Sequence, residues 1–176
     1  QYGANLIALS VNLGRELGIR PAERAMMIVF AWMNSRESVP SHETIRGWMQ
    51  RVGLGRIHRA KKEDGGTWLV DHTNQIGPEK VLAVLRVRSA PSDGEALRHQ
   101  DVEVLATIPA TKFKREDVAR EYAQIKARFG TPDNVVIDGA VELRDSVSVL
   151  ESEGHTPRIF RDPKHVLANK LEALLK

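Results

Sequence analysis

The sequence predicts an α/β protein in which a small all-α region precedes a mixed β-sheet with flanking helices. Over the first 60 residues, apolar side chains recur three and four positions apart, which is the period of a helix. After Gly65-Gly66 the pattern changes to short apolar runs separated by turn residues, which is typical of strands. The charge also changes sign: residues 1–62 carry ten Lys/Arg and four Asp/Glu (net +6), whereas residues 63–176 carry 16 and 19 (net −3). We therefore expect two domains, 1–62 and 63–176.

At least three helices are expected in the first domain. The first should end at Gly18, and Pro21 lies in the first turn of the second, which should run to about Ser35. The third follows Pro40-Ser41, where the Ser41 hydroxyl can cap the amides of residues 42–51. Four apolar residues of that helix should face inward: Ile45, Trp48, Met49 and Val52. Its opposite face is polar and basic.

The second domain should contain five strands. Their expected ranges are 67–70, 81–87, 102–108, 135–137 and 158–160. A turn-rich loop at 74–78 would join the first two as a hairpin, and another at 91–94 precedes the third. Because short connections join the first three strands, these should form an antiparallel meander. Each later strand follows a helix and must pair in parallel by a crossover.

Three helices should alternate with these later strands. The first carries a four-residue apolar stripe: Val118, Tyr122, Ile125 and Phe129. Gly130 follows its last turn as a natural stop. The second should run from about Val141 to Glu153, before Gly154. The third opens at Asp162-Pro163, with Asp162 as its N-cap. Its sheet-facing side comprises Leu167, Leu171 and Leu174.

Two carboxylates directly follow apolar strands: Asp71 after residues 68–70, and Asp138 after residues 135–137. A carboxylate at the end of a buried strand is costly to desolvate unless it binds a cation or finds hydrogen-bond donors. If the two strands are parallel neighbours, both acids lie at one edge of the sheet and can share Mg²⁺. Two such ions about 4 Å apart would support phosphoryl transfer. The spacing alone fits equally well an Asp that forms a turn or caps a helix.

The motifs around these acids carry a family resemblance that covers most of the chain. Asp71-His72-Thr73, between a strand and a hairpin, resembles the first-acid segment of DDE transposases and retroviral integrases, and residues 136–140 (VIDGA) resemble the second. Residues 18–54 are similar to the helix-turn-helix regions of bacterial insertion-sequence transposases. The resemblance implies a ribonuclease-H-like fold, two Mg²⁺ or Mn²⁺ ions with DNA bound, and DNA strand cleavage and transfer. It also implies a homo-oligomer assembled on transposon ends.

The resemblance further implies a third acid, for which the chain offers Glu172. Thirty-three residues separate Glu172 from Asp138, and the expected helix after the fifth strand carries it. Many bacterial family members have an insertion before this helix, so the third ligand is either Glu172 or a residue beyond Lys176. The expected catalytic and metal-binding set is thus Asp71, Asp138 and Glu172. His72 is expected to be structural or to support the ligands, and His165 either holds DNA or is an exposed helix-edge residue.

The net charge of residues 1–62 predicts a polyanionic partner, here double-stranded DNA. Candidate DNA-binding residues belong to the third helix: His42, Thr44, Arg46, Gln50 and Arg51. Arg46 and Gln50 suit base edges in the major groove, and Arg51 suits a phosphate. The alternatives are a solvated basic face and helical packing without DNA contact.

The composition narrows the remaining classes of protein. The absence of Cys excludes disulfides, thiolate catalysis and Cys-ligated zinc. Because the chain has neither an 18-residue apolar run nor a secretory signal pattern, we expect no membrane partner and a location in the bacterial cytoplasm, at the nucleoid. A start without Met and an end within a helical pattern favour a fragment of a longer enzyme. Two other functions stay open: a non-catalytic helix-turn-helix regulator, and a ribonuclease-H-type nuclease, which would not need a sequence-reading helix.

Overall fold

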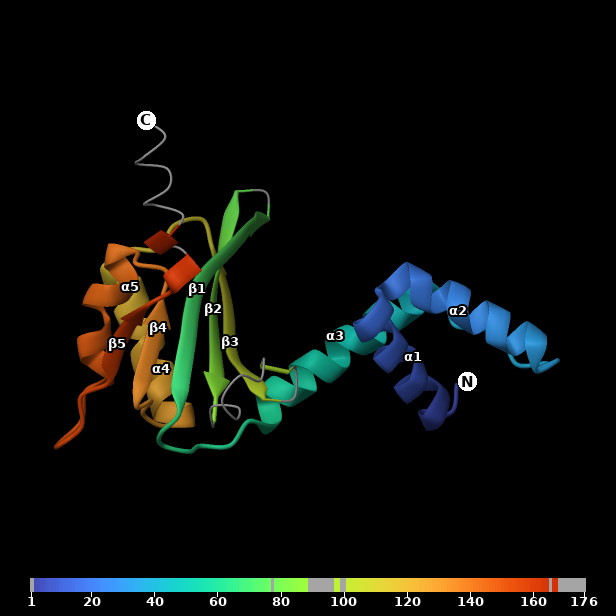
Figure 1. Ribbon diagram of the computed structural model, residues 1–176, viewed down its shortest axis with the longest axis horizontal. Helices are drawn as coiled ribbons and strands as arrows, with labels where there is room; N and C mark the ends of the chain where they lie inside the picture. Colours follow the sequence, from blue (N-terminus) through green and yellow to red (C-terminus); the bar gives the residue numbers. More distant parts are fainter. Residues whose placement is uncertain (1, 77, 89–96, 99–100, 165, 168–176) are drawn as a thin grey trace. The chain divides into compact units, whose positions relative to one another are not determined.

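The computed structural model describes residues 2–76, 78–88, 97–98, 101–164 and 166–167. The chain divides into two compact units, Gln1–His58 and Arg59–Lys176, which we call the helical unit and the sheet unit. In Figure 1 the helical unit is coloured blue to teal and the sheet unit green to red. Within the described part of the chain, no helix combines the length and the apolar character needed to cross a membrane.

Three helices build the helical unit: α1 (Ala4–Leu17), α2 (Ile19–Trp32) and α3 (His42–Arg59). Gly18 separates the first two at a φ of 90°, a conformation that favours glycine, so α1 ends where the sequence predicts. The amide of Thr44 donates to Ser41 Oγ at 3.3 Å, which is the expected cap of α3. The second helix is shorter than predicted and ends at Trp32, because Asn34 reverses the chain at a φ of 51°.

The helical unit has a small core of three buried residues within its described part: Ala22, Met26 and Ile45. Gly14 lets α1 approach α3 closely, since a Cβ at this position would lie 2.8 Å from Met49 Sδ and 3.2 Å from Ile45 Cγ2. Val52, predicted to face inward, is instead 39% exposed. The helical period alone therefore overestimated the buried face of α3.

The sheet unit contains one five-stranded mixed sheet in the order β3-β2-β1-β4-β5 (Figure 1). The strands are β1 (Thr67–Ile76), β2 (Glu79–Val87), β3 (Val102–Ala110), β4 (Asn134–Ile137) and β5 (Arg158–Arg161). The first three pair antiparallel, whereas β1 with β4 and β4 with β5 pair parallel. This topology confirms the predicted meander followed by crossover strands.

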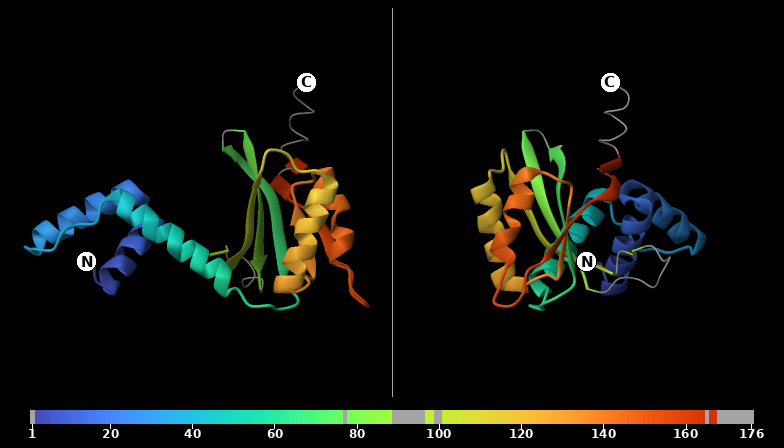
Figure 2. Two further views of the ribbon diagram at one scale, coloured as in Figure 1. Left: turned by 180° about the vertical axis from the view of Figure 1, so that it is seen from behind. Right: turned by 60° about the vertical axis from the view of Figure 1, so that its left-hand side comes forward.

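Helices cover one face of this sheet, as Figure 2 shows. The longest, α4 (Arg115–Phe129), buries the apolar stripe that the sequence predicts: Val118, Tyr122, Ile125 and Phe129. These side chains share a core with alternate residues of the strands, among them Trp68 and Val70 of β1 and Val135 and Ile137 of β4. Because buried residues occupy alternate positions along each strand, they mark the side of the strand that faces the helices.

The helix predicted over 141–153 is interrupted. The structure has a short α5 (Val141–Asp145) followed by a 3₁₀ turn (Val147–Leu150). Ser146 lies between them, and its hydroxyl contacts the carbonyl oxygens of Glu142 (2.7 Å) and Arg115 (3.0 Å). A serine that bonds back to the carbonyl four residues earlier competes with the helical hydrogen bonds, which accounts for the break.

A buried arginine ties the chain before β1 to the end of α4. Arg86 of β2 is 1% exposed, and its guanidinium donates to three carbonyl oxygens: Lys61 (2.9 Å), Glu63 (3.2 Å) and Phe129 (3.0 Å). Its Nε donates to the Glu103 carboxylate at 3.1 Å. The guanidinium thus directs its rigid set of donors to several acceptors at once. We call Arg86, Glu103 and these carbonyl groups the arginine clamp.

The described chain ends in residues 166–167, which are helical like residues 163–164. The Lys164 amide donates to Asp162 Oδ1 at 2.9 Å, in keeping with the N-cap role predicted for Asp162. Several sequence predictions lie outside the described residues: the turn at 91–94, and the side chains of His165, Leu171, Glu172 and Leu174.

Candidate functional site

Asp71 lies inside β1 rather than after it, because β1 continues to Ile76. Its partner in the antiparallel ladder with β2 is Ala83. The parallel ladder with β4, however, stops at the pair Val70 and Ile137. Asp71 is therefore the first residue of β1 beyond its contact with β4. It is exposed, and by strand alternation it lies on the sheet face opposite to Val70, away from the helices.

Asp138 occupies the equivalent position on the neighbouring strand. It directly follows Ile137, as Asp71 directly follows Val70, so both acids come one residue after the last pair of the parallel ladder. Neighbouring strands lie about 4.8 Å apart, which is a separation that a shared cation can bridge. Asp138 is half-buried, and its Oδ1 accepts a hydrogen bond from the Ala140 amide at 2.8 Å. This turn, with Gly139 at a φ of 99°, fixes the start of the connection to α5.

Two buried polar groups accompany this pair of acids. The Tyr122 hydroxyl and His72 Nε2 are both buried and have no hydrogen-bond partner within the described part of the chain. Burial raises the pKa of Tyr122 above its ordinary value, and the negative charge of Asp138 raises it further. The phenol therefore stays protonated and keeps a hydrogen atom to donate.

His72 follows Asp71 on the helix-facing side of β1. Its ring stacks on Phe113, with centroids 5.2 Å apart, and its Nδ1 lies 4.0 Å from Glu142 Oε1. These contacts fit the structural or supporting role that the sequence predicts for His72. Glu142 escaped the sequence reasoning, because a charged residue in the first turn of a helix is ordinary there.

The described residues include no group of three or more His, Cys, Asp or Glu side chains that could hold a metal ion. Asp71 and Asp138 supply two carboxylates just after the end of the parallel ladder. The third expected ligand, Glu172, lies outside the described residues. Two carboxylates fit Mg²⁺, which keeps several waters and takes further oxygen ligands from substrate phosphates. They do not by themselves make a closed protein site.

The five candidate DNA-binding residues of α3 separate into two groups. Arg46, Gln50 and Arg51 are exposed. Arg46 pairs with Glu43 one turn earlier, with Nη1 and Oε2 2.9 Å apart. Because Arg46 and Gln50 are four residues apart, they lie on the same side of the helix.

The other two candidates make contacts within the helical unit. His42 Nδ1 lies 2.9 Å from Glu23 Oε2 and so links α3 to α2. The Thr44 hydroxyl is hydrogen-bonded to Ser41 Oγ at 3.0 Å, at the cap of α3. These contacts favour a structural role for His42 and Thr44. Of the five candidates, only Arg46, Gln50 and Arg51 have exposed side chains that a ligand could reach.

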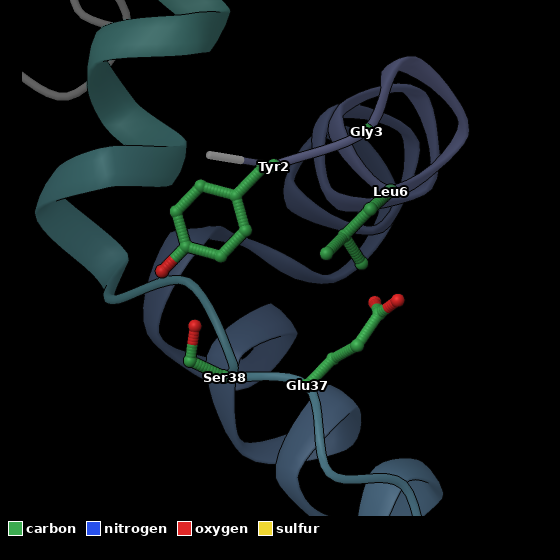
Figure 3. A pocket seen from close by; sticks show the side chains of 5 residues that line it. All are labelled: Tyr2, Gly3, Leu6, Glu37 and Ser38. Atoms are coloured by element: carbon green, nitrogen blue, oxygen red, sulfur yellow. The ribbon is translucent and has the colours of Figure 1, made fainter.

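The helical unit also has an open pocket where the start of the chain meets the α2–α3 connection (Figure 3). It is lined by Tyr2, Gly3, Leu6, Glu37 and Ser38. The Tyr2 ring packs edge-on against Trp48, with centroids 5.2 Å apart. Ligand sites are usually concave and largely apolar with a few convergent polar groups, and this open pocket lacks such an enclosure.

No protein-family model matches this chain, and no curated protein is similar enough to it to count as a relative.

Proposed function

We propose that this chain is a DNA transposase of the DDE type, in which Asp71 and Asp138 belong to a two-metal phosphoryl-transfer site. One observation carries the proposal: the two acids follow the last residue pair, Val70 and Ile137, of two adjacent parallel strands. A chance pair of turn-forming Asp residues would have no reason to share a register. The mixed sheet, with an antiparallel meander beside two parallel strands, supports the ribonuclease-H-like resemblance.

The proposed metal ligands are Asp71, Asp138 and Glu172, and the proposed ions are Mg²⁺ or Mn²⁺. Two such ions, when bound with DNA, would activate the attacking oxygen and stabilise the leaving oxygen of an in-line displacement. The protein contributes the carboxylates and their positions. The hydrogen bond from the Ala140 amide restricts the Asp138 carboxylate.

The proposed role of the helical unit is to bind double-stranded DNA at transposon ends. Residues 1–62 carry a net charge of +6, so their affinity for DNA should fall steeply as salt rises. Arg46 and Gln50 are the proposed base contacts, and Arg51 is the proposed phosphate contact. The enzyme would act in the bacterial cytoplasm, at the nucleoid.

A metal-binding and cleavage experiment tests the catalytic part. Binding of Mn²⁺ is measured by calorimetry, and nicking of supercoiled plasmid DNA in Mn²⁺ is measured on the same samples. Asp71→Asn and Asp138→Asn should both weaken Mn²⁺ binding and reduce nicking to background, because Asn keeps the size but removes the charge. Asp145→Asn is the matched control, since Asp145 pairs with Arg144 at the surface and should change neither measurement.

Two further results decide between versions of the site. If Glu172→Gln behaves like the two Asp variants, Glu172 is the third acid; if it behaves like the parent, Glu172 is not a metal ligand. Parental nicking and parental Mn²⁺ binding by Asp71→Asn would overturn the transposase proposal.

The alternative is a non-catalytic DNA-binding regulator with the same helical unit. The observation that favours it is the lack of a three-ligand metal group among the described residues. It predicts salt-dependent DNA binding by the parent together with no measurable Mn²⁺ site. The double variant Arg46→Ala, Gln50→Ala should lose preference for specific DNA under either proposal.

A further inference from the structure

Arg161 is the last residue of β5 and lies beside the strand that leads into Asp138 (Figure 1). Its partner in the parallel ladder is Ile137, and the Asp162 amide donates to the Ile137 carbonyl oxygen at 2.8 Å. The end of β5 is therefore fixed next to the residue that precedes Asp138. The Arg161 side chain is exposed, and its guanidinium has no hydrogen-bond or ion-pair partner within the described part of the chain.

The connection between β3 and α4 brings a second cation to the same end of the sheet. Phe113 of this connection is buried, and its ring stacks on His72, the residue after Asp71. This contact anchors the connection close to the end of the β1–β4 ladder. Lys112 precedes Phe113, and its side chain is exposed and has no partner among the described residues.

The strand order separates these two cations along the edge of the sheet. In the order β3-β2-β1-β4-β5, the acids follow the ladder of the two strands β1 and β4. The connection that carries Lys112 leaves β3 on one side of these strands, and Arg161 ends β5 on the other side. Strands about 4.8 Å apart make the distance from β1 to β5 about 10 Å. A DNA strand presents several phosphates over such a length.

The charge of these residues suits phosphates rather than carboxylates of the same chain. Residues 63–176 carry a net charge of −3, so their total charge does not attract DNA, and any contact must come from cations at particular places. Arginine and lysine are the usual protein ligands of phosphate. Arg88 contacts Glu103 at 3.2 Å and is engaged within the fold, whereas Lys112 and Arg161 are not.

Arg158 provides a comparison on the same strand. It is exposed, and its guanidinium also has no partner among the described residues. Its partner in the ladder is Asn134, at the opposite end of β4 from Asp138. Three residues of strand separate it from Arg161, which is about 10 Å. Arg158 thus matches Arg161 in charge and exposure but lies away from the acids.

We propose that Lys112 and Arg161 bind the DNA phosphates on the two sides of Asp71 and Asp138, so that the strand to be cut runs along this edge of the sheet. The inference rests on the proposed function, because it takes the two acids as the place of phosphoryl transfer. It adds a DNA contact in the sheet unit to the one proposed for the helical unit. Lys112 and Arg161 are positioning residues: they hold the strand, while the carboxylates hold the ions.

The salt dependence of DNA binding tests these contacts directly. The whole chain is titrated into a short fluorescent DNA duplex at one Mn²⁺ concentration and a series of KCl concentrations. Each phosphate contact adds about 0.9 to the steepness of the slope of log K against log salt. Lys112→Gln and Arg161→Gln should each make this slope shallower by about one and weaken binding to all sequences equally. Arg158→Gln is the matched control and should keep the parental slope.

The plasmid-nicking assay supplies a second readout. A slope of about 0.9 corresponds to a factor of roughly eight in affinity at about 0.1 M salt relative to 1 M. Lys112→Gln and Arg161→Gln should therefore raise KM for DNA by a similar factor and leave kcat near the parental value. Calorimetry should show parental Mn²⁺ binding in both variants, since neither residue is a metal ligand. Circular dichroism checks that each variant stays folded.

The outcomes separate this inference from the proposed function. Parental slopes and KM values in Lys112→Gln and Arg161→Gln would overturn the inference, even if Asp71→Asn abolishes nicking and the proposed function stands. An equal loss in Arg158→Gln would also overturn it, because binding would then follow total charge rather than position. Shallower slopes in Lys112→Gln and Arg161→Gln alone, with parental nicking and Mn²⁺ binding in Asp71→Asn, would sustain the DNA contacts and overturn only the proposed function.

Discussion

The two units of this chain differ in how much apolar surface they bury. Among the described residues, the core of the sheet unit contains fifteen buried residues, whereas that of the helical unit contains three. The helical unit also leaves Trp32 and Ile28 open. Because small cores contribute little net stability, the sheet unit should hold its fold alone, while the helical unit should gain stability from a partner.

The units also differ in how their ends are fixed. In the sheet unit, the chain before β1 is held by the arginine clamp and by backbone contacts such as that of the Glu63 amide with the Phe129 carbonyl oxygen (3.0 Å). The helical unit relies on a few side-chain contacts, such as the one between His42 and Glu23. Substitutions that remove one feature at a time can test whether this contrast determines stability.

The largest expected effect is the loss of the clamp. Arg86→Met keeps an unbranched side chain but removes the donor of the Lys61, Glu63 and Phe129 carbonyl oxygens and leaves the Glu103 carboxylate with Arg88 alone. We expect the sheet unit to lose about 3–5 kcal/mol, as is typical when one partner of a buried pair is removed. Urea denaturation measures this loss.

Arg88→Met is the matched control for the clamp. Arg88 also contacts Glu103, at 3.2 Å, but its side chain is 50% exposed, so its removal should cost less than about 1 kcal/mol. Equal losses for the two variants would mean that burial of Arg86 does not determine the strength of the clamp.

The next effect separates steric contact from backbone strain at two glycines of the sheet unit. Gly130 (φ 95°) and Gly139 (φ 99°) both have left-handed backbones, but a Cβ at Gly130 would collide with the Glu63 carbonyl, whereas one at Gly139 has open space. Ala at Gly139 should cost about 1–2 kcal/mol, the cost of placing an L-residue in that region. Ala at Gly130 should cost clearly more, as measured by thermal unfolding. Equal costs at Gly130 and Gly139 would show that the chain before β1, which carries the Glu63 carbonyl, moves aside and relieves the clash at Gly130.

A pH dependence of stability should follow from Glu103. Burial raises the pKa of Glu103, but hydrogen bonds and the charges of Arg86 and Arg88 outweigh it, so the net shift is downward from 4.5. A carboxyl with a lowered folded-state pKa stabilises the fold above its unfolded-state pKa, and this stability is lost as the pH falls through the folded value. The free energy of unfolding should therefore drop below about pH 4.5, and Glu103→Gln should reduce that slope. An unchanged slope would contradict the assignment.

The sequence predicted those parts of the fold in which local pattern and tertiary packing agree. The stripe on α4 is an example, because one face of a long helix packs on the sheet and its periodicity records that packing. The antiparallel meander and the parallel pairing of the later strands followed from connection lengths, since only a crossover can join parallel strands. The sequence left open whether the strands before Asp71 and Asp138 are neighbours, and the structure pairs them in parallel up to Val70 and Ile137.

The failures occurred where a long-range contact overrides the local pattern. The first strand was expected to end at residue 70, before a loop at 74–78, but pairing with β2 extends β1 to Ile76. Ser146, at the break between α5 and the 3₁₀ turn, bonds back to the Glu142 carbonyl and also contacts the carbonyl of Arg115, 31 residues away, and the sequence shows neither contact. In the sequence, Arg86 is one charged residue of an expected strand, and nothing there shows the carbonyl groups that its guanidinium contacts in the fold. Such contacts have no periodicity that a sequence could display.

The smallest expected effect concerns α3, for which the sequence named helical residues only as far as Val52. In the structure it continues to Arg59 through Gly53 and Gly55, and a Cβ at either glycine would have open space around it. Gly53→Ala should therefore stabilise the helix by about 0.5–1 kcal/mol, because Ala lowers the entropy cost of helix formation without a clash.

Gly14→Ala, in α1, is the control with the opposite sign. There the new methyl group would lie 2.8 Å from Met49 Sδ, so α1 must move away from α3 and the helical unit should lose stability. The two single substitutions can be compared by the helical signal in circular dichroism during thermal unfolding. If Gly53→Ala destabilised the protein as Gly14→Ala does, the residues after Arg51 would not be helical in solution, and the shorter helix predicted from the sequence would be correct.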